Sequence, residues 1–210
     1  MPTETETYSG PAGAIDCALD LPDGEPAGWA LVLHPHPLHG GARDNKVVTT
    51  IARACVQQGL LAVRPDFRGV GKSEGSFDKA RGETDDMLEL VARFRERHPE
   101  AAAGRWVLAG FSFGTAVAAQ LYATLAAQGE RLPDAVILAG PAVGRFQFRD
   151  VRLPADTLLV HGELDEVVPL KEAEDWAAGH GLQVTVVPQA SHFFHGKLIE
   201  LRDLVTQRIA

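Results

Sequence analysis

The amino-acid sequence predicts an α/β fold, with a doubly wound, mostly parallel sheet of about seven strands, helices on both faces and no lid domain. Short continuous apolar runs alternate with segments of helical periodicity along the chain, which is typical of this class. Most of these runs lack polar alternation, so both faces of the strands are expected to be buried. The length of 210 residues and the 45% hydrophobic content suit one domain. We therefore predict a single domain over residues 1–210, with residues 1–10 as a flexible N-terminus.

The first predicted strand differs from the others. Residues 15–20 alternate between apolar and polar side chains, which is typical of an antiparallel strand with one face in water. Pro22-Asp23-Gly24 follows and predicts a hairpin turn, so we expect this strand at an edge of the sheet. Buried strands are predicted over residues 29–34, 60–63, 106–109, 135–138 and 157–160, and a sixth strand over 182–187, where Gln183 and Thr185 alternate outward.

Helices are predicted between these strands. Asp44 or Asn45 can cap a helix that continues to about Gln58 and is closed by Gly59. Residues 84–94 place their apolar side chains on one face, as in a second helix. Further helices are predicted over residues 113–127, 170–178 and 197–209.

Charge and composition exclude several classes of protein. With 28 acidic against 20 basic residues the net charge is −8, so nucleic-acid binding has little electrostatic support. The polar, acidic N-terminus lacks the features of a signal peptide, and no apolar run reaches the ~18 residues that a membrane span needs. Cys17 and Cys55 are expected to be buried, reduced thiols. We therefore expect a cytoplasmic protein that binds neither nucleic acid nor membrane; its oligomeric state stays open.

A candidate nucleophile lies at a predicted strand-to-helix turn. Gly110-Phe111-Ser112-Phe113-Gly114 follows one apolar run and opens the next helix. In such a turn the serine backbone is strained and its hydroxyl projects from the sheet, while glycines two positions away avoid collisions. The helix also directs its first N–H groups at the site where negative charge develops. These features predict Ser112 as the nucleophile.

A serine hydroxyl needs a base, and the base needs a carboxylate that orients it. In open α/β sheets both should follow later strands at their carboxyl ends. Asp165 follows one such strand and precedes Val-Val-Pro, so we prefer it to Glu163 and Glu166, which we interpret as solvated loop charges. His192 follows the last predicted strand closely, and we prefer it to His195, which is a candidate for capping or packing. The order Ser, Asp, His is the one that this kind of site uses.

These three segments together resemble the α/β-hydrolase superfamily, in particular its small lid-less bacterial serine hydrolases, akin to dienelactone hydrolases and small carboxylesterases. Two further segments support the resemblance: the histidine-rich loop at residues 33–41, and residues 64–73, which are similar to the family's D-x-R-G-x-G-x-S segment. The match extends from about Trp29 to the C-terminus. It is specific for the fold and the triad, but not for the substrate. We interpret Asp66, Arg68 and Ser73 as structural residues of a turn.

The histidine-rich loop at residues 33–41, called the oxyanion loop below, departs from the family pattern, because the usual His-Gly is His34-Pro35 here. The resemblance implies an oxyanion hole made by the Phe113 N–H and one N–H of this loop. Proline has no N–H, so Pro35 and Pro37 cannot serve. His36 is our first choice and Leu38 our second.

A metal site is the alternative interpretation of this loop, since His34, His36 and His39 lie within six residues. The triad explains the other motifs without a metal, so we expect neither a metal nor another cofactor. Several aromatic residues are close to the predicted site in sequence, and either an apolar substrate wall or core packing would account for them. The tentative pocket residues are Phe111, Phe146, Phe193 and Phe194, with Phe148 on the same connection as Phe146.

The sequence thus predicts a serine hydrolase that cleaves small-molecule esters, or thioesters, through an acyl-enzyme. Two alternatives stay open: a peptidase or amidase that uses the same triad, and a non-catalytic binding module on a hydrolase fold.

Overall fold

The computed structural model describes residues 2–146 and 151–210, which form a sheet of eight strands in the order β1-β2-β4-β3-β5-β6-β7-β8. Strands β3 to β8 pair in parallel with their neighbours, whereas β2 is antiparallel to both β1 and β4. Parallel pairing needs a crossover between strands, and helices supply it here. The strands are β1 (Thr3–Gly10), β2 (Gly13–Asp20), β3 (Gly28–Leu33), β4 (Leu60–Pro65), β5 (Arg105–Phe111), β6 (Ala135–Ala139), β7 (Leu158–Gly162) and β8 (Val184–Val187).

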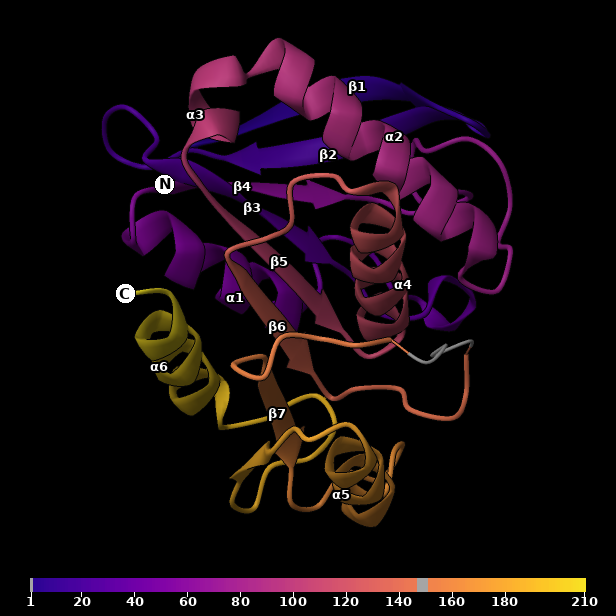
Figure 1. The fold of residues 1–210 in the computed structure, drawn as a ribbon, viewed down its shortest axis with the longest axis vertical. Helices are drawn as coiled ribbons and strands as arrows, with labels where there is room; N and C mark the ends of the chain where they lie inside the picture. Colours follow the sequence, from indigo (N-terminus) through magenta and orange to yellow (C-terminus); the bar gives the residue numbers. More distant parts are fainter. Residues whose placement is uncertain (1, 147–150) are drawn as a thin grey trace.

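Helices cover both faces of the sheet, as Figure 1 shows. One buried cluster joins the sheet to α2, α3, α4 and α5, and a second joins it to α1 and α6. The central strands are therefore buried on both sides, which confirms the predicted doubly wound α/β class. The helices are α1 (Lys46–Gln57), α2 (Arg81–Arg97), α3 (Pro99–Ala103), α4 (Phe113–Gln128), α5 (Leu170–Gly179) and α6 (Leu198–Ile209), with a 3₁₀ turn, η1, at Pro37–His39.

The N-terminal segment corrects one prediction. Residues 1–10 were expected to be flexible, but Thr3–Gly10 is strand β1, paired with β2 over its whole length. Its alternation of threonine and glutamate suits an edge strand, since β-branched residues favour strands and charges on an edge discourage further pairing. Tyr8 is 1% exposed and anchors the strand in the core.

The position of β2 is a second correction. This strand is antiparallel, as predicted, but it is not at the edge because β1 lies outside it. The hairpin turn precedes β2, where Gly10 pairs with Gly13, instead of following it at residues 22–24. The next strand, β3, pairs with β4 and β5 and not with β2.

The helix after the oxyanion loop begins at Lys46 and is capped by Asn45, whose side chain accepts a hydrogen bond from the Val47 N–H at 2.9 Å. Asp44, the other predicted cap, instead binds Arg64 at 2.9 Å. The connection between β6 and β7 contains no helix in its described part, in keeping with the absence of a lid. No helix among the described residues is long and apolar enough to cross a membrane.

Candidate active site

Ser112 occupies the sharp turn between β5 and α4, with φ of 52° and ψ of −119°. This is a left-handed conformation that a residue with a side chain rarely adopts, and such strain is commonly found at functional sites. The turn requires both flanking glycines. A Cβ on Gly110 would lie 2.4 Å from the Gly114 carbonyl oxygen, and one on Gly114 would lie 2.4 Å from the Leu33 carbonyl oxygen.

The structure brings Ser112, His192 and Asp165 into one line of hydrogen bonds. The Ser112 Oγ lies 2.9 Å from His192 Nε2, and His192 Nδ1 lies 2.7 Å from Asp165 Oδ2. Since a carboxylate only accepts, Nδ1–H is the donor to Asp165 and Nε2 is left to accept from the serine hydroxyl. His195, the other candidate base, is exposed and makes neither contact.

These side chains meet because their strands end at the same edge of the sheet. Ser112 follows β5, Asp165 follows β7 and His192 follows β8. In an open parallel sheet the carboxyl ends of the strands form the usual place for a site. His192 is only 2% exposed and Asp165 8% exposed, so their hydrogen bond is largely shielded from water.

The surroundings of Asp165 keep it ionised. Burial alone would raise the pKa of this carboxyl, but hydrogen bonds from His192, Val168 and Val167 outweigh it and hold the pKa below its ordinary value. Its Oδ1 accepts from the N–H groups of Val167 at 2.9 Å and Val168 at 2.7 Å. A second buried imidazole, that of His161, lies 3.3 Å from Oδ2 and donates to the Val168 carbonyl. Asp165 therefore has a fixed orientation and a stable negative charge.

Glu163 and Glu166 do more than the sequence suggested. Both are exposed, as expected of loop charges. However, Glu166 accepts a hydrogen bond from the backbone N–H of His192 at 3.1 Å, and Glu163 accepts one from Gln189 at 2.8 Å. Two side chains of the loop after β7 thus hold the loop after β8, which carries His192, in place. In the sequence these two glutamates look like ordinary surface charges.

Two backbone N–H groups that have no acceptor in the described part of the chain are candidates for an oxyanion hole. The N–H groups of Phe113 and His36 have no acceptor within the part of the chain that the structure describes. The Leu38 N–H, our second choice, donates to His36 Nδ1 at 3.2 Å. Because that amide is already occupied, His36 is the better candidate of the two.

His34 is a structural residue of the same loop. It is fully buried, its Nδ1–H donates to the Pro35 carbonyl at 2.7 Å, and its Nε2 accepts from the Phe67 N–H at 2.9 Å. Burial lowers its pKa to about 4, although the bond to Pro35 acts in the opposite direction. With both ring nitrogens engaged, His34 cannot join His36 and His39 around a metal. No group of three metal-ligating side chains occurs in residues 2–146 and 151–210.

The segment with the D-x-R-G-x-G-x-S pattern supports the loops around the site. The Ser73 hydroxyl donates to the Asp66 carbonyl at 2.8 Å and accepts from the Asp16 N–H at 2.9 Å. Arg68 binds Asp86 of α2 through two nitrogens at 2.7 and 2.8 Å. These contacts tie the loop after β4 to β2 and α2.

The aromatic residues that were predicted to line a pocket lie in different environments. Phe194 is fully buried in the core beside α1 and α6, so the expectation that it lines a pocket is wrong. Phe111 is also fully buried, with its ring 5.1 Å from that of His192, and it supports the imidazole from behind. Phe193 is 38% exposed beside His192. Phe146 lines a cavity, and Phe148 lies outside the described residues.

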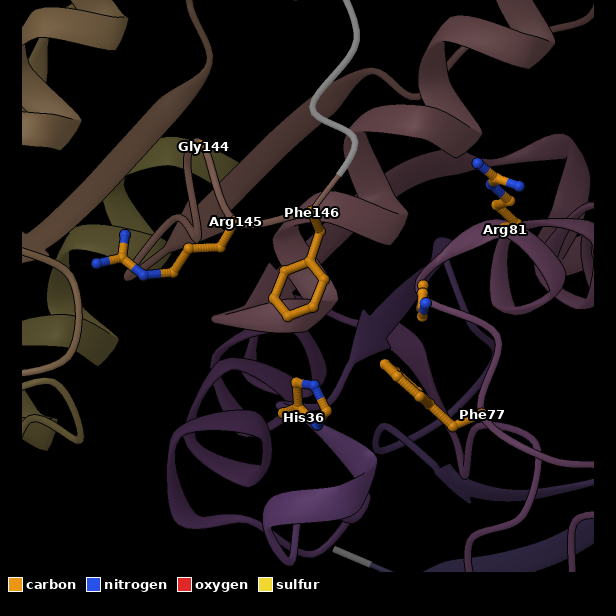
Figure 2. Close-up of a pocket in the computed structure, with 7 residues that line it drawn as sticks. His36, Phe77, Arg81, Gly144, Arg145 and Phe146 are labelled. Atoms are coloured by element: carbon orange, nitrogen blue, oxygen red, sulfur yellow. The ribbon is translucent and has the colours of Figure 1, made fainter.

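The cavity measures about 550 Å³ and lies beside the oxyanion loop. Figure 2 shows His36, Phe77 and Phe146 around it, with Arg81 at its margin. The His36 ring lies 4.7 Å from that of Phe77 and 5.3 Å from that of Phe146. Phe77, Lys79, Arg81 and Arg145 could not be identified from the sequence; their one signal was that the loops after β4 and β6 begin at the edge of the sheet that holds Ser112.

The sequence and the fold are similar to those of known proteins over nearly the whole chain. The model of a family described as serine aminopeptidase, S33, matches residues 36–147. An uncharacterized protein of Rickettsia prowazekii is 30% identical over 94% of this chain and 85% of its own length.

Two solved structures are similar in both sequence and fold. XC6422 from Xanthomonas campestris, a member of the α/β serine hydrolases without a lid, is 37% identical, with a TM-score of 0.89 over 99% of this chain and 93% of that one. An α/β serine hydrolase homologue from Coxiella burnetii is 36% identical, with a TM-score of 0.88 over 99% of this chain and 97% of that one.

Proposed function

Because the chain belongs to the α/β-hydrolase superfamily of serine hydrolases, we propose that it hydrolyses carboxylic esters of small molecules through Ser112, His192 and Asp165. The observation that carries this proposal is the continuous line of hydrogen bonds from the Ser112 hydroxyl through His192 to Asp165. Nucleophile, base and orienting carboxylate then occur in the arrangement that acyl transfer needs.

In the first step His192 Nε2 takes the proton of Ser112 as Oγ attacks the ester carbonyl carbon. The carbonyl oxygen becomes an oxyanion, which the N–H groups of Phe113 and His36 stabilise; each such donor is worth on the order of 3 kcal/mol in the transition state. Asp165 accepts from Nδ1–H throughout and stabilises the imidazolium without taking its proton. His192 then protonates the leaving alcohol, and the acyl group stays on Oγ.

In the second step water replaces the alcohol. His192 takes a proton from the water as its oxygen attacks the acyl carbon, and the same two N–H groups hold the new oxyanion. His192 returns the proton to Ser112 Oγ, which leaves as the hydroxyl, and the carboxylic acid is released. The site is back in its starting state, so the chain's own residues suffice for a full turnover.

Covalent labelling tests the assignment of residues. A fluorophosphonate probe should label wild-type protein at Ser112, and Ser112→Ala should not be labelled.

His192→Ala should lower ester hydrolysis at least roughly a thousandfold, because the serine then lacks its base. The matched control is His195→Ala, which removes an exposed imidazole three residues further along the same loop and should keep activity within about twofold. Absence of labelling in folded wild-type protein would favour a binding module over an enzyme.

Amide hydrolysis is the second candidate, since the family model that matches is described as a serine aminopeptidase. An amide nitrogen is a poorer leaving group than an ester oxygen and must be protonated before it departs. We therefore expect p-nitrophenyl butyrate to be turned over far faster than alanine p-nitroanilide. The reverse order would reassign the site to peptide or amide bonds while leaving the catalytic residues as proposed.

A further inference from the structure

The cavity beside the oxyanion loop combines aromatic walls with unpaired cations. Its apolar side is formed by His36, Phe77 and Phe146, and the buried ring of Phe113, which adjoins Ser112, lies 4.9 Å from that of Phe146. Its other lining residues include Lys79, Arg81 and Arg145, of which Figure 2 labels the two arginines. A cavity of about 550 Å³ is in the range of small-molecule sites.

Of the three cations, Arg145 alone has a carboxylate partner among the residues that the structure describes. Arg145 extends away from the aromatic rings in Figure 2 and binds Glu172 at 2.6 Å. Lys79 and Arg81 are exposed and form no ion pair with any residue that the structure describes. The protein as a whole carries a net charge of −8, so two free cations at the margin of one cavity form a local exception that favours an anion there.

The backbone that presents Lys79 is strained and firmly held. Lys79 and Ala80 have φ values of 54° and 72°, in the left-handed region that glycine normally occupies. The fully buried carboxylate of Glu83 fixes this turn by accepting from the N–H groups of Asp78 and Ala80, both at 2.8 Å. Strain that the surroundings enforce is typical of ligand-binding turns. The carboxylate of Asp78, the chain neighbour of Lys79, also accepts a backbone hydrogen bond, from the Gly82 N–H at 3.1 Å.

The position of the cavity indicates which part of an ester would enter it. The leaving alcohol must lie near His192, which protonates it. None of the cavity's lining residues comes from the His192 loop; they come from the oxyanion loop and from the segments after β4 and β6. The cavity is therefore on the acyl side of the site.

We propose that the enzyme prefers esters whose acyl part has an apolar body and ends in a carboxylate, with the body against His36, Phe77 and Phe146 and the carboxylate near Lys79 and Arg81. This inference rests on the proposed esterase function. It assigns a substrate class that neither the catalytic residues nor the similar proteins specify.

Three p-nitrophenyl esters of equal chain length test it: the monoester of adipic acid, with a terminal carboxylate; the hexanoate, which is neutral; and the 6-aminohexanoate, with a terminal ammonium. For wild-type protein kcat/KM should fall in that order, with about a tenfold preference for the adipate over the hexanoate. The preference should weaken as salt is added, because exposed charges are screened. In Lys79→Glu/Arg81→Glu the adipate-to-hexanoate ratio should fall at least about tenfold and the aminohexanoate should gain.

The matched control is Arg53→Glu, which reverses an exposed cation of α1 on the opposite face of the sheet. This variant should keep the wild-type ratio of kcat/KM for the adipate to kcat/KM for the hexanoate. Equal kcat/KM for adipate and hexanoate, or a ratio that the double variant leaves unchanged, would overturn the inference while the esterase function stood. If no ester is cleaved and no fluorophosphonate adduct forms, the proposed function itself fails.

Discussion

Three histidines of this protein differ in what their surroundings allow an imidazole to do. His192 is buried but has an ionised partner, so it can receive a proton from Ser112 and remain stabilised by Asp165. His34 is buried between two backbone groups and has no such partner at hydrogen-bond distance, which favours the neutral ring. His36 is half-buried, lines the cavity and is the proposed donor of one oxyanion-hole N–H. Burial and partners, rather than residue type, separate these roles.

Stability should therefore depend on pH through His34. The folded state keeps this ring neutral until the pH falls to about 4, whereas the ordinary pKa is 6.5. Between these values the unfolded chain binds a proton that the folded chain does not, so the free energy of unfolding decreases as the pH falls. The loss is on the order of 3 kcal/mol, from 1.36 kcal/mol per unit of pKa.

The variant His34→Gln checks this by urea denaturation at a series of pH values. It should be less stable than wild type near pH 7, since the buried hydrogen bonds are altered, but its stability should change less between about pH 7 and pH 4. His195→Gln, which removes an exposed imidazole, should keep the wild-type slope. If His34→Gln and wild type gave parallel curves, the neutral buried state of His34 would be refuted.

At the scale of elements, β1 shows how an edge strand is held by one side chain. Most of its residues are exposed, yet Tyr8 lies in the same core cluster as α2. The guanidinium of Arg97, near the end of α2, lies 4.4 Å from the centre of the Tyr8 ring, and the Tyr8 hydroxyl donates to Glu6 at 2.6 Å. The strand thus covers an edge of the sheet and one side of α2 at the same time.

Truncation of this ring should loosen the whole strand. We expect Tyr8→Ala to lower the free energy of unfolding by about 3 kcal/mol, since it leaves a cavity and removes the contact with Arg97. Thr5→Ala, an exposed position on the same strand, should cost about 1 kcal/mol or less. Chemical denaturation gives both values. Equal effects of the two changes would mean that the N-terminal segment is as loosely held as its composition suggested.

Across the whole molecule, the proposed site spans regions of unequal packing. Ser112 follows the central strand β5, whose neighbourhood includes the stacked rings of Trp29 and Trp106, both fully buried. Asp165 and His192 follow β7 and β8 at the end of the sheet. There β8 buries only Val187, and α5 buries only two alanines. The side of the site that carries acid and base therefore has the thinner core.

Because of this difference in packing, we expect the reactivity of Ser112 to be lost at a lower denaturant concentration than the secondary structure. In a urea titration, fluorophosphonate labelling of Ser112 should decline at a lower concentration than the far-UV circular dichroism signal, because the β7–β8 end opens locally. Gly179→Ala should raise the labelling midpoint with little effect on the dichroism midpoint, since a Cβ there meets open space and alanine favours the helix α5. Coincident midpoints in wild type would show a single cooperative unit.

The features that depend on local pattern could be predicted from the sequence. Continuous apolar runs specify buried strands whatever lies around them, which predicted the parallel sheet. Gly110 and Gly114 around Ser112 reflect steric limits inside one turn, and the order of Ser112, Asp165 and His192 along the chain follows from strand order. These properties are set by neighbours in the sequence, so they can be read from it.

Which distant segments of the chain meet could be known only from the folded molecule. The polar residues of β1 gain a partner strand, the Glu166 carboxylate reaches the backbone of His192, and Phe194 turns into the core. Residues near 77–81 and 144–146 face one cavity although more than sixty positions separate them in the chain. Such contacts depend on how strands and helices pack over long separations, and a charged or aromatic residue looks the same in sequence whether it lines a site, supports a loop or lies in water.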